Sequence, residues 1–142
     1  MAKIPEALHE PLNTAYPEFV CLVGTVQPGG WAQIGPRGSV VVLDDETVGY
    51  WDRGTGTTHD AVKDGSTVTV FFKSPEMKDA GVLPKGGIAR LYGTATIHNE
   101  GPIREEIWTK MVQYERDSDP EKKGRAVTLK IERAEDLAHN PL

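Results

Sequence analysis

The 142-residue chain has the length of one domain with its own core, and its 38% apolar and 26% charged residues are typical of a folded, soluble protein. A net charge of −5 provides no broad basic field, so we expect no general attraction to nucleic acid or to an acidic membrane. A membrane-spanning helix needs about 18 consecutive apolar residues, and no segment of the sequence approaches this length. The N-terminus has no signal-peptide pattern, so we expect a cytoplasmic protein.

The first expected element is a short N-terminal helix over residues 5–12. Pro5 suits the first turn of a helix, where a missing backbone N–H costs no hydrogen bond. Ile4, Leu8 and Leu12 fall four residues apart, which places them on one apolar face. The sequence therefore predicts a helix that packs on a larger core.

Four strands are expected next, in two hairpins. Apolar runs rich in β-branched residues alternate with the turn signals Gln-Pro-Gly-Gly and Asp-Asp-Glu. The expected strands cover residues 19–26, 31–34, 39–43 and 47–51. Cys21 is the single cysteine, so it cannot form an intrachain disulfide, and we expect it to act as a small core side chain. Trp31 is interpreted as a core aromatic.

The second half of the chain mixes helices and strands. Capping residues predict a short helix at 57–62, and apolar residues one turn apart predict an amphipathic helix at 102–114. Gly93 indicates a β-bulge or a close approach by another group. The expected strands cover residues 66–73, 88–98 and 126–131, with a loop at 74–87 and a solvated charged run at 117–125.

Six or seven strands with short hairpins and only three short helices indicate a mainly β fold, an antiparallel barrel with helices attached. Closing the sheet would remove its exposed edges. We expect one domain over residues 1–142, in which residues 1–18 form the helical lead-in and residues 138–142 form the tail.

The region around the second hairpin combines the residue types that hold a phosphate. Arg37 and Arg53 each supply a permanently charged planar donor, nearby hydroxyls add short donors, and glycines admit backbone amides close to an anion. The alternative for the arginines is a set of surface ion pairs with Asp44, Asp45 or Asp52. Helix capping is the alternative for the threonines, and it can coexist with phosphate binding. These residues predict a phosphorylated ligand on a β scaffold.

The order of the elements and two glycine-rich segments resemble the FMN-binding split barrel of the pyridoxamine 5′-phosphate oxidase family. The segments read GPRGSV at residues 35–40 and WDRGTGTT at residues 51–58. A late IWTKM and an ERAEDL ending are similar to the family's branch of small bacterial proteins, and the resemblance covers residues 19–137. It implies a split barrel that forms a homodimer, with two FMN sites at the subunit interface and oxidoreductase activity on a small-molecule substrate.

The resemblance also implies which residues contact the flavin. Residues on the third expected strand would lie along the flavin, residues at the end of the fourth would add an aromatic or hydroxyl contact, and the residues that follow would surround the phosphate. The implied cofactor-binding residues are Arg37, Ser39 and Val40, then Tyr50 and Trp51, then Arg53, Thr55, Thr57 and Thr58. Family members often place adjacent basic residues where this chain has Thr57-Thr58-His59, which leaves a deazaflavin or haem open as the cofactor.

Other chemistry is weakly indicated. The four histidines have no HxxxH or HxH spacing, so no metal site is expected, and no GxSxG elbow, P-loop or GxGxxG fingerprint occurs. His59 is a candidate phosphate-side donor, Trp51 is open between a core and a ligand role, and Trp108 is interpreted as packing or a dimer contact.

The substrate and the reaction stay open. The full oxidases of the family carry a basic C-terminal extension that grips the phosphate of the vitamin, whereas this chain ends at AHNPL, so we expect a different substrate. No catalytic acid or base stands out, and a bound flavin supplies its own redox chemistry. A non-catalytic flavin-binding protein is therefore the alternative to an oxidoreductase.

Overall fold

Seven antiparallel strands form a single sheet in the order β2-β1-β5-β6-β7-β4-β3. The computed structural model describes residues 2–54 and 56–142. The strands are β1 (Cys21–Val26), β2 (Ala32–Arg37), β3 (Val41–Asp44), β4 (Thr47–Asp52), β5 (Thr67–Lys73), β6 (Ile88–His98) and β7 (Arg125–Asp136). The expected mainly β, antiparallel architecture is confirmed.

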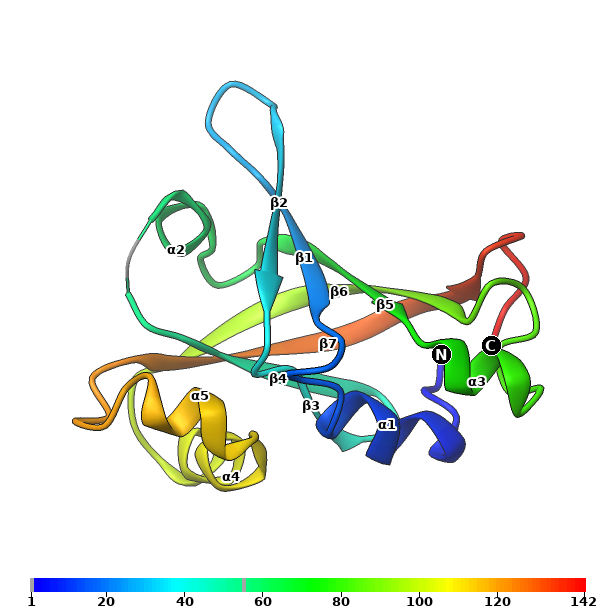
Figure 1. Cartoon of the computed structure of the whole chain (residues 1–142). Helices are drawn as coiled ribbons and strands as arrows, with labels where there is room; N and C mark the ends of the chain where they lie inside the picture. Colours follow the sequence, from blue (N-terminus) through cyan, green and yellow to red (C-terminus); the bar gives the residue numbers. More distant parts are fainter. Residues whose placement is uncertain (1, 55) are drawn as a thin grey trace.

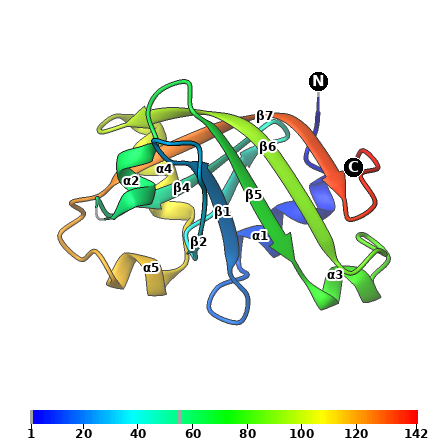
Figure 2. The ribbon, with the colours of Figure 1, turned by 90° about the horizontal axis from the view of Figure 1, so that it is seen from above.

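The sheet curls into a barrel that is split on one side. It is strongly twisted, so that β1 runs across the direction of β7 (Figures 1 and 2). Its two edge strands, β2 and β3, are consecutive in the chain and are joined by residues 38–40. Inward side chains of six strands form the main core; examples are Val23, Tyr50, Val70, Leu91 and Leu129. The sheet therefore keeps two edges, where full closure would have removed both.

The N-terminal segment covers the β3 edge. It forms a 3-10 turn, η1 (Glu6–Leu8), followed by α1 (His9–Asn13), close to the expected helix. Leu8 and Leu12 are buried in the main core, as their spacing predicts. The Val42 amide donates to Asn13 Oδ1 at 2.7 Å, so this helix satisfies part of the exposed edge of β3.

The expected loop at 74–87 contains a helix, α3 (Pro75–Asp79), so that part of the prediction is wrong. Ser74 is its N-cap, since the Met77 amide donates to Ser74 Oγ at 3.3 Å, and Pro75 occupies the first turn. Both are ordinary helix-start signals, and the glycines that follow obscured them.

The expected helix at 102–114 is two helices. The first, α4 (Pro102–Lys110), ends where the backbone becomes extended at Met111, and α5 (Gln113–Asp117) begins one residue after Val112. Arg116 Nη1 donates to the carbonyls of Trp108 and Thr109 at 3.2 and 3.0 Å. Its guanidinium therefore donates hydrogen bonds to carbonyls at the end of α4 that would have accepted from backbone amides if the helix had continued.

The helix α4 packs on the outer face of the sheet and makes a second, smaller core. Ile107 and Met111 are buried there against Val41, Trp51 and Ala126. This small core lies beside β4 and β7, opposite the barrel interior. It fixes the position of the loop that connects α5 to β7.

Strands β6 and β7 form the longest ladder of the sheet. The register shifts between Tyr92 and Gly93, which confirms the expected irregularity. A Cβ at Gly93 would lie 2.7 Å from the Lys130 carbonyl oxygen, so the close approach is confirmed as well. Strand β7 continues five residues beyond the expected Ile131 because β6 still offers partners, with Ala89 opposite Asp136.

The prediction that Trp31 is a core residue is wrong. Its side chain is 77% exposed. Trp31 directly precedes β2, in the loop of the β1–β2 hairpin, which rises above the rest of the molecule (Figure 1). None of the residues of β2 is fully buried, because the strand forms one edge of the split sheet and part of it extends past the core. Cys21, by contrast, is buried and unpaired, and burial raises its pKa to about 12.

Candidate anion-binding site

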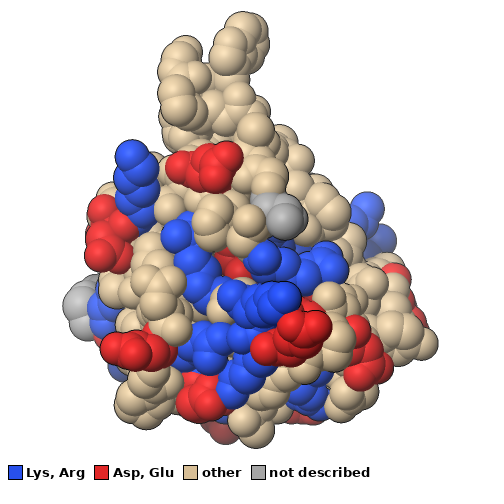
Figure 3. Space-filling model, turned by 90° about the vertical axis from the view of Figure 1, so that its left-hand side faces the viewer, with Lys and Arg blue, Asp and Glu red and all other residues tan. Residues whose placement is uncertain are grey.

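Arg37 and Arg53 come together at one small polar pocket. Arg37 ends β2 and Arg53 follows β4, and with Pro36, Trp51, Asp52 and Glu115 they line a cavity of about 80 Å³. Within residues 2–54 and 56–142, neither arginine forms an ion pair with a carboxylate. Lys and Arg side chains gather on the side of the molecule that carries α2 (Thr57–Ala61), α4 and α5 (Figure 3).

The ion pairs suggested as an alternative for the arginines are not formed, because the aspartates have other partners. Asp45 lies 3.7 Å from His9 Nε2. Asp52 is 1% exposed and its Oδ2 lies 3.0 Å from His59 Nδ1 and 3.5 Å from Arg125 Nη2. Two potential cations therefore face Asp52, and Arg37 and Arg53 keep their positive charge for another anion.

Arg125 and His59 also fix α2 to the barrel. Arg125 Nη2 donates to the carbonyls of His59 and Val62 at 2.9 and 3.1 Å, at the end of this helix. Arg125 stands directly opposite Asp52 in the β4–β7 ladder, which explains their contact. His59, the candidate phosphate donor, is thus directed at Asp52 through its Nδ1 atom.

The two described threonines of the expected phosphate cradle bond to β2. Gln33 Nε2 donates to Thr58 Oγ1 at 3.2 Å, and Thr57 Oγ1 donates to Gln33 Oε1. Thr57 is exposed and Thr58 is buried. Neither caps α2: its N-cap is Gly56, whose φ of 87° suits glycine, so the capping alternative is wrong for both. Thr55 lies outside the described residues.

Ser39, Val40, Tyr50 and Trp51 have buried side chains. The Ser39 hydroxyl donates to the Trp51 carbonyl at 3.1 Å and accepts from the Trp51 amide at 2.9 Å, which extends the β3–β4 pairing. Burial raises the pKa of Tyr50 to about 12, and its hydroxyl has no hydrogen-bond partner in the part of the chain that the structure describes. Of these four residues, Trp51 lines the arginine pocket, whereas Val40 and Tyr50 belong to the main core. The contact of all four with a cofactor stays a prediction.

Sequence reasoning missed four residues around this site. Glu115 lines the pocket from α5. The other three contact nearby residues: Gln33 of β2 bonds Thr58, Asp119 of the α5–β7 loop bonds Trp51, and Arg125 of β7 contacts Asp52. Asp119 lies in the charged run expected to be solvated, yet it is buried and accepts from Trp51 Nε1 at 2.8 Å. Only Arg125 had a usable signal, since a basic residue at the start of the last strand can pair with an acidic one across the ladder.

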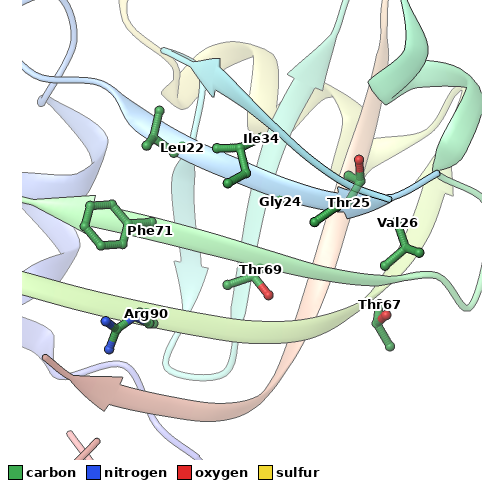
Figure 4. A pocket seen from close by; sticks show the side chains of 10 residues that line it. Leu22, Gly24, Thr25, Val26, Ile34, Thr67, Thr69, Phe71 and Arg90 are labelled. Carbon is green, nitrogen blue, oxygen red and sulfur yellow. The ribbon is translucent and has the colours of Figure 1, made fainter. Parts of the chain in front are cut away.

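A larger, apolar groove lies on the outer face of the sheet. It measures about 500 Å³ and is lined from β1, β2, β5 and β6. Leu22, Ile34 and Phe71 project into it, Gly24 leaves space at its floor, and Arg90 is its one charged residue (Figure 4). Ile34 is 69% exposed and Val26 is 55% exposed, so the groove continues into the apolar surface of the β1–β2 hairpin.

Over residues 2–54 and 56–142, no group of three His, Cys, Asp or Glu side chains is placed to hold a metal ion. None of the described helices is long and apolar enough to cross a membrane.

Comparisons with known proteins find matches only among solved structures; no family model and no curated protein matches the chain. HupZ of Group A Streptococcus is 22% identical, with a TM-score of 0.70 over 97% of each chain. A Clostridium acetobutylicum protein of the pyridoxinephosphate oxidase family, related to general stress protein 26, is 15% identical, with a TM-score of 0.61 over 92% of this chain and 88% of that one. An FMN-binding protein from Syntrophomonas wolfei is 16% identical, with a TM-score of 0.60 over 90% and 82%.

Identities this low establish the fold and leave the ligand open. The expected relationship in architecture is confirmed: the seven-stranded antiparallel sheet, its split edge and its attached helices match these proteins over nearly the whole chain. The chain therefore has the split-barrel fold of the pyridoxamine 5′-phosphate oxidase-like proteins.

Proposed function

We propose that this protein binds FMN, with the phosphate in the pocket between Arg37 and Arg53. The observation that carries the proposal is a pair of arginines in one polar cavity, neither of which has a carboxylate partner among the described residues. Guanidinium groups are suited to bidentate phosphate binding. An FMN-binding protein with the same fold adds support.

The size of the pocket supports a phosphate rather than a ring. Its volume of about 80 Å³ is that of two or three waters, at about 30 Å³ each. The isoalloxazine would lie outside it, beside the strand ends that Ser39, Val40, Tyr50 and Trp51 build. Thr57 is exposed, and its hydroxyl, which donates to Gln33 Oε1, would have to turn from Gln33 to donate to a phosphate oxygen instead. Thr55 and Thr58 remain proposed contacts from the resemblance alone.

The chain's own residues bind, orient and shield the cofactor. Arg37 and Arg53 neutralise the phosphate, while His59 and Arg125 face the carboxylate of Asp52, which also lines the pocket. The bound flavin would supply the redox chemistry, which is hydride or electron transfer to or from a small molecule. Oxidoreductase activity on a small substrate is therefore the proposed role, with non-catalytic flavin binding as the alternative.

The proposal includes a homodimer formed through the apolar groove and the β1–β2 hairpin. Trp31, Ile34 and Val26 are 77%, 69% and 55% exposed, and contiguous exposed apolar surface is typical of protein interfaces. A second copy is the occupant we propose, because a two-fold axis would place the hairpin of each chain against the groove of the other.

Light scattering tests the dimer. The double variant Trp31→Ser with Ile34→Ser should be monomeric with an unchanged circular dichroism spectrum, because both residues contribute little to the core. Ile103→Ser, a partly exposed apolar residue on α4, is the control and should stay dimeric. A wild-type protein that is monomeric at high concentration contradicts the dimer.

Spectroscopic titration tests the cofactor. FMN should bind stoichiometrically and shift its visible absorption, and Arg37→Ala with Arg53→Ala should weaken binding by about 3 kcal/mol, or about 100-fold, since each charge-assisted hydrogen bond contributes about 1.5–3 kcal/mol. Lys73→Ala with Lys78→Ala makes the same change of charge at exposed residues outside the pocket and should leave affinity unchanged.

Three results would change the assignment. Equal FMN affinity in the double arginine variant and in the wild type would show that neither arginine binds the phosphate. Binding of a deazaflavin or haem in place of FMN would support the alternative cofactors. A flavin that NAD(P)H reduces and an acceptor reoxidises supports an oxidoreductase, whereas a flavin that never turns over favours a binding protein.

A further inference from the structure

Glu115 is an acidic side chain in the anion pocket that forms no ion pair among the described residues. It comes from α5 and lines the cavity with Arg37 and Arg53. No basic nitrogen in residues 2–54 and 56–142 lies within ion-pair distance of its carboxylate, although two arginines share the same small cavity. One carboxylate and two guanidinium groups therefore line the same cavity without forming an ion pair among the described residues.

The position of Glu115 is built into the fold. A Cβ at Gly38 would lie 2.6 Å from Glu115 Oε1 and 2.6 Å from the Tyr16 ring, so both side chains pack on bare backbone next to Arg37. Tyr16 also meets Tyr114 of α5 edge to face, with 6.0 Å between ring centroids. The other side of α5 is anchored by Arg116, which donates to carbonyls of α4.

The charges around the cavity leave a single positive charge for a ligand. Arg37 and Arg53 contribute two positive charges and Glu115 one negative charge. The negative charge of Asp52 is already matched by the positive charge of Arg125. A singly charged anion would make the pocket neutral, whereas a doubly charged phosphate would leave an excess negative charge facing Glu115.

We propose that Glu115 is a specificity-determining residue that makes this pocket select the singly charged form of a phosphate. Its carboxylate accepts a hydrogen bond from the remaining P–OH group, while the two arginines donate to the other oxygens. The inference rests on the proposed phosphate site. It predicts that affinity falls as a phosphomonoester loses its second proton, near about pH 6.

Other ionisable groups face the cavity and define the controls. They come from β2, the end of β4, the N-terminal lead-in and, behind Asp52, α2 and β7. The groups are Arg37, Asp52, Arg53, Tyr16, His59 and Arg125. Of these, His59 is the imidazole, and Glu115→Gln leaves it in place. A pH dependence caused by His59 would persist after Glu115 is replaced, so the two sources can be separated.

The experiment measures FMN affinity between about pH 6 and about pH 8, across the second ionisation of the phosphate. Wild-type protein should bind about tenfold more tightly at the lower pH, equivalent to about 1.4 kcal/mol. Glu115→Gln should bind about tenfold more tightly than wild type at the higher pH and lose the preference for low pH. Asp117→Asn, the same change of charge on an exposed residue of α5, should behave as wild type.

Inorganic phosphate, measured by calorimetry over the same pH range, keeps this inference separate from the flavin proposal. Phosphate binding with the Glu115-dependent pH profile supports the inference even if FMN does not bind. Matching pH profiles in wild type and Glu115→Gln overturn it, even if FMN binds tightly. Phosphate and FMN that bind neither protein overturn both proposals.

Discussion

Replacing Asp119 by alanine should destabilise the fold, because one carboxylate joins β4 to the loop that leads into β7. Trp51 Nε1 and the Gly124 amide each donate to Asp119 Oδ2 at 2.8 Å, and the Lys123 amide donates to Oδ1 at 3.0 Å. Arg104 lies 4.8 Å from the centre of the Trp51 ring and donates to the Gly124 carbonyl. Trp51 also lines the anion pocket, so these contacts support one wall of it.

The size of the effect follows from burial. Trp51 is 3% exposed and Asp119 is 8% exposed, and Gly124 is buried, so the indole N–H and the Gly124 amide would lose their acceptor in a dry environment. An unsatisfied buried donor costs about 1–3 kcal/mol, which gives a total of about 3 kcal/mol. For a chain of this length the melting temperature should fall by roughly 10 °C. Asp119→Asn keeps one oxygen acceptor and should lose about half as much.

Urea unfolding, followed by circular dichroism, measures this difference. Asp117→Ala is the control, since Asp117 is exposed and such substitutions usually change stability by less than about 0.5 kcal/mol. If Asp119→Ala unfolds at the same urea concentration as the control, the carboxylate does not hold the loop, and the account of this wall is wrong.

The dependence of stability on acidic pH provides an independent test of the Asp119 hydrogen bonds. Burial acts to raise the pKa of Asp119, but the hydrogen bonds from Trp51 and the two amides outweigh it and hold the pKa below its ordinary value. A lowered pKa in the folded state contributes stability above the unfolded value of about 3.9, and this contribution is lost as the pH falls through the folded value. Asp119→Ala should therefore show a weaker loss of stability with acid than the wild type; equal slopes would contradict the lowered pKa.

Two further predictions concern the core. Gly93→Ala should lower the free energy of unfolding by about 2 kcal/mol, because its Cβ would lie 2.7 Å from the Lys130 carbonyl oxygen. Gly24→Ala is the control and should be tolerated, because its Cβ would have no neighbour closer than 3.8 Å. Equal melting temperatures of the two variants would disprove the close approach at Gly93. Cys21, buried and with its pKa raised to about 12, should resist thiol reagents at about pH 8 until the protein unfolds, and fast labelling of the native protein would show that the site is open.

Local sequence patterns determined most of the strands and the N-terminal helix. Alternation of apolar residues is a property of adjacent positions, so seven strands and the face shared by Leu8 and Leu12 could be predicted without knowing what they contact. The bulge at Gly93 was marked by a glycine inside a β-rich run. The phosphate chemistry of Arg37 and Arg53 was visible as residue type, because guanidinium charge does not depend on the fold.

Tertiary structure decided burial and partnership. Trp31 is an aromatic residue beside a predicted strand, which is typical of a core position, but an aromatic is buried only if another element covers it. Within residues 2–54 and 56–142, no element covers Trp31 beside the edge strand β2. The break between α4 and α5 depends on Arg116 reaching back to carbonyls of α4. Glu115 and Asp119 lie more than sixty positions after Arg53 and Trp51 in the chain, and no local sequence pattern relates the two pairs. Contacts at such separation arise only when the sheet and α4 place distant segments side by side, which is why the charge of the pocket could be known only from the fold.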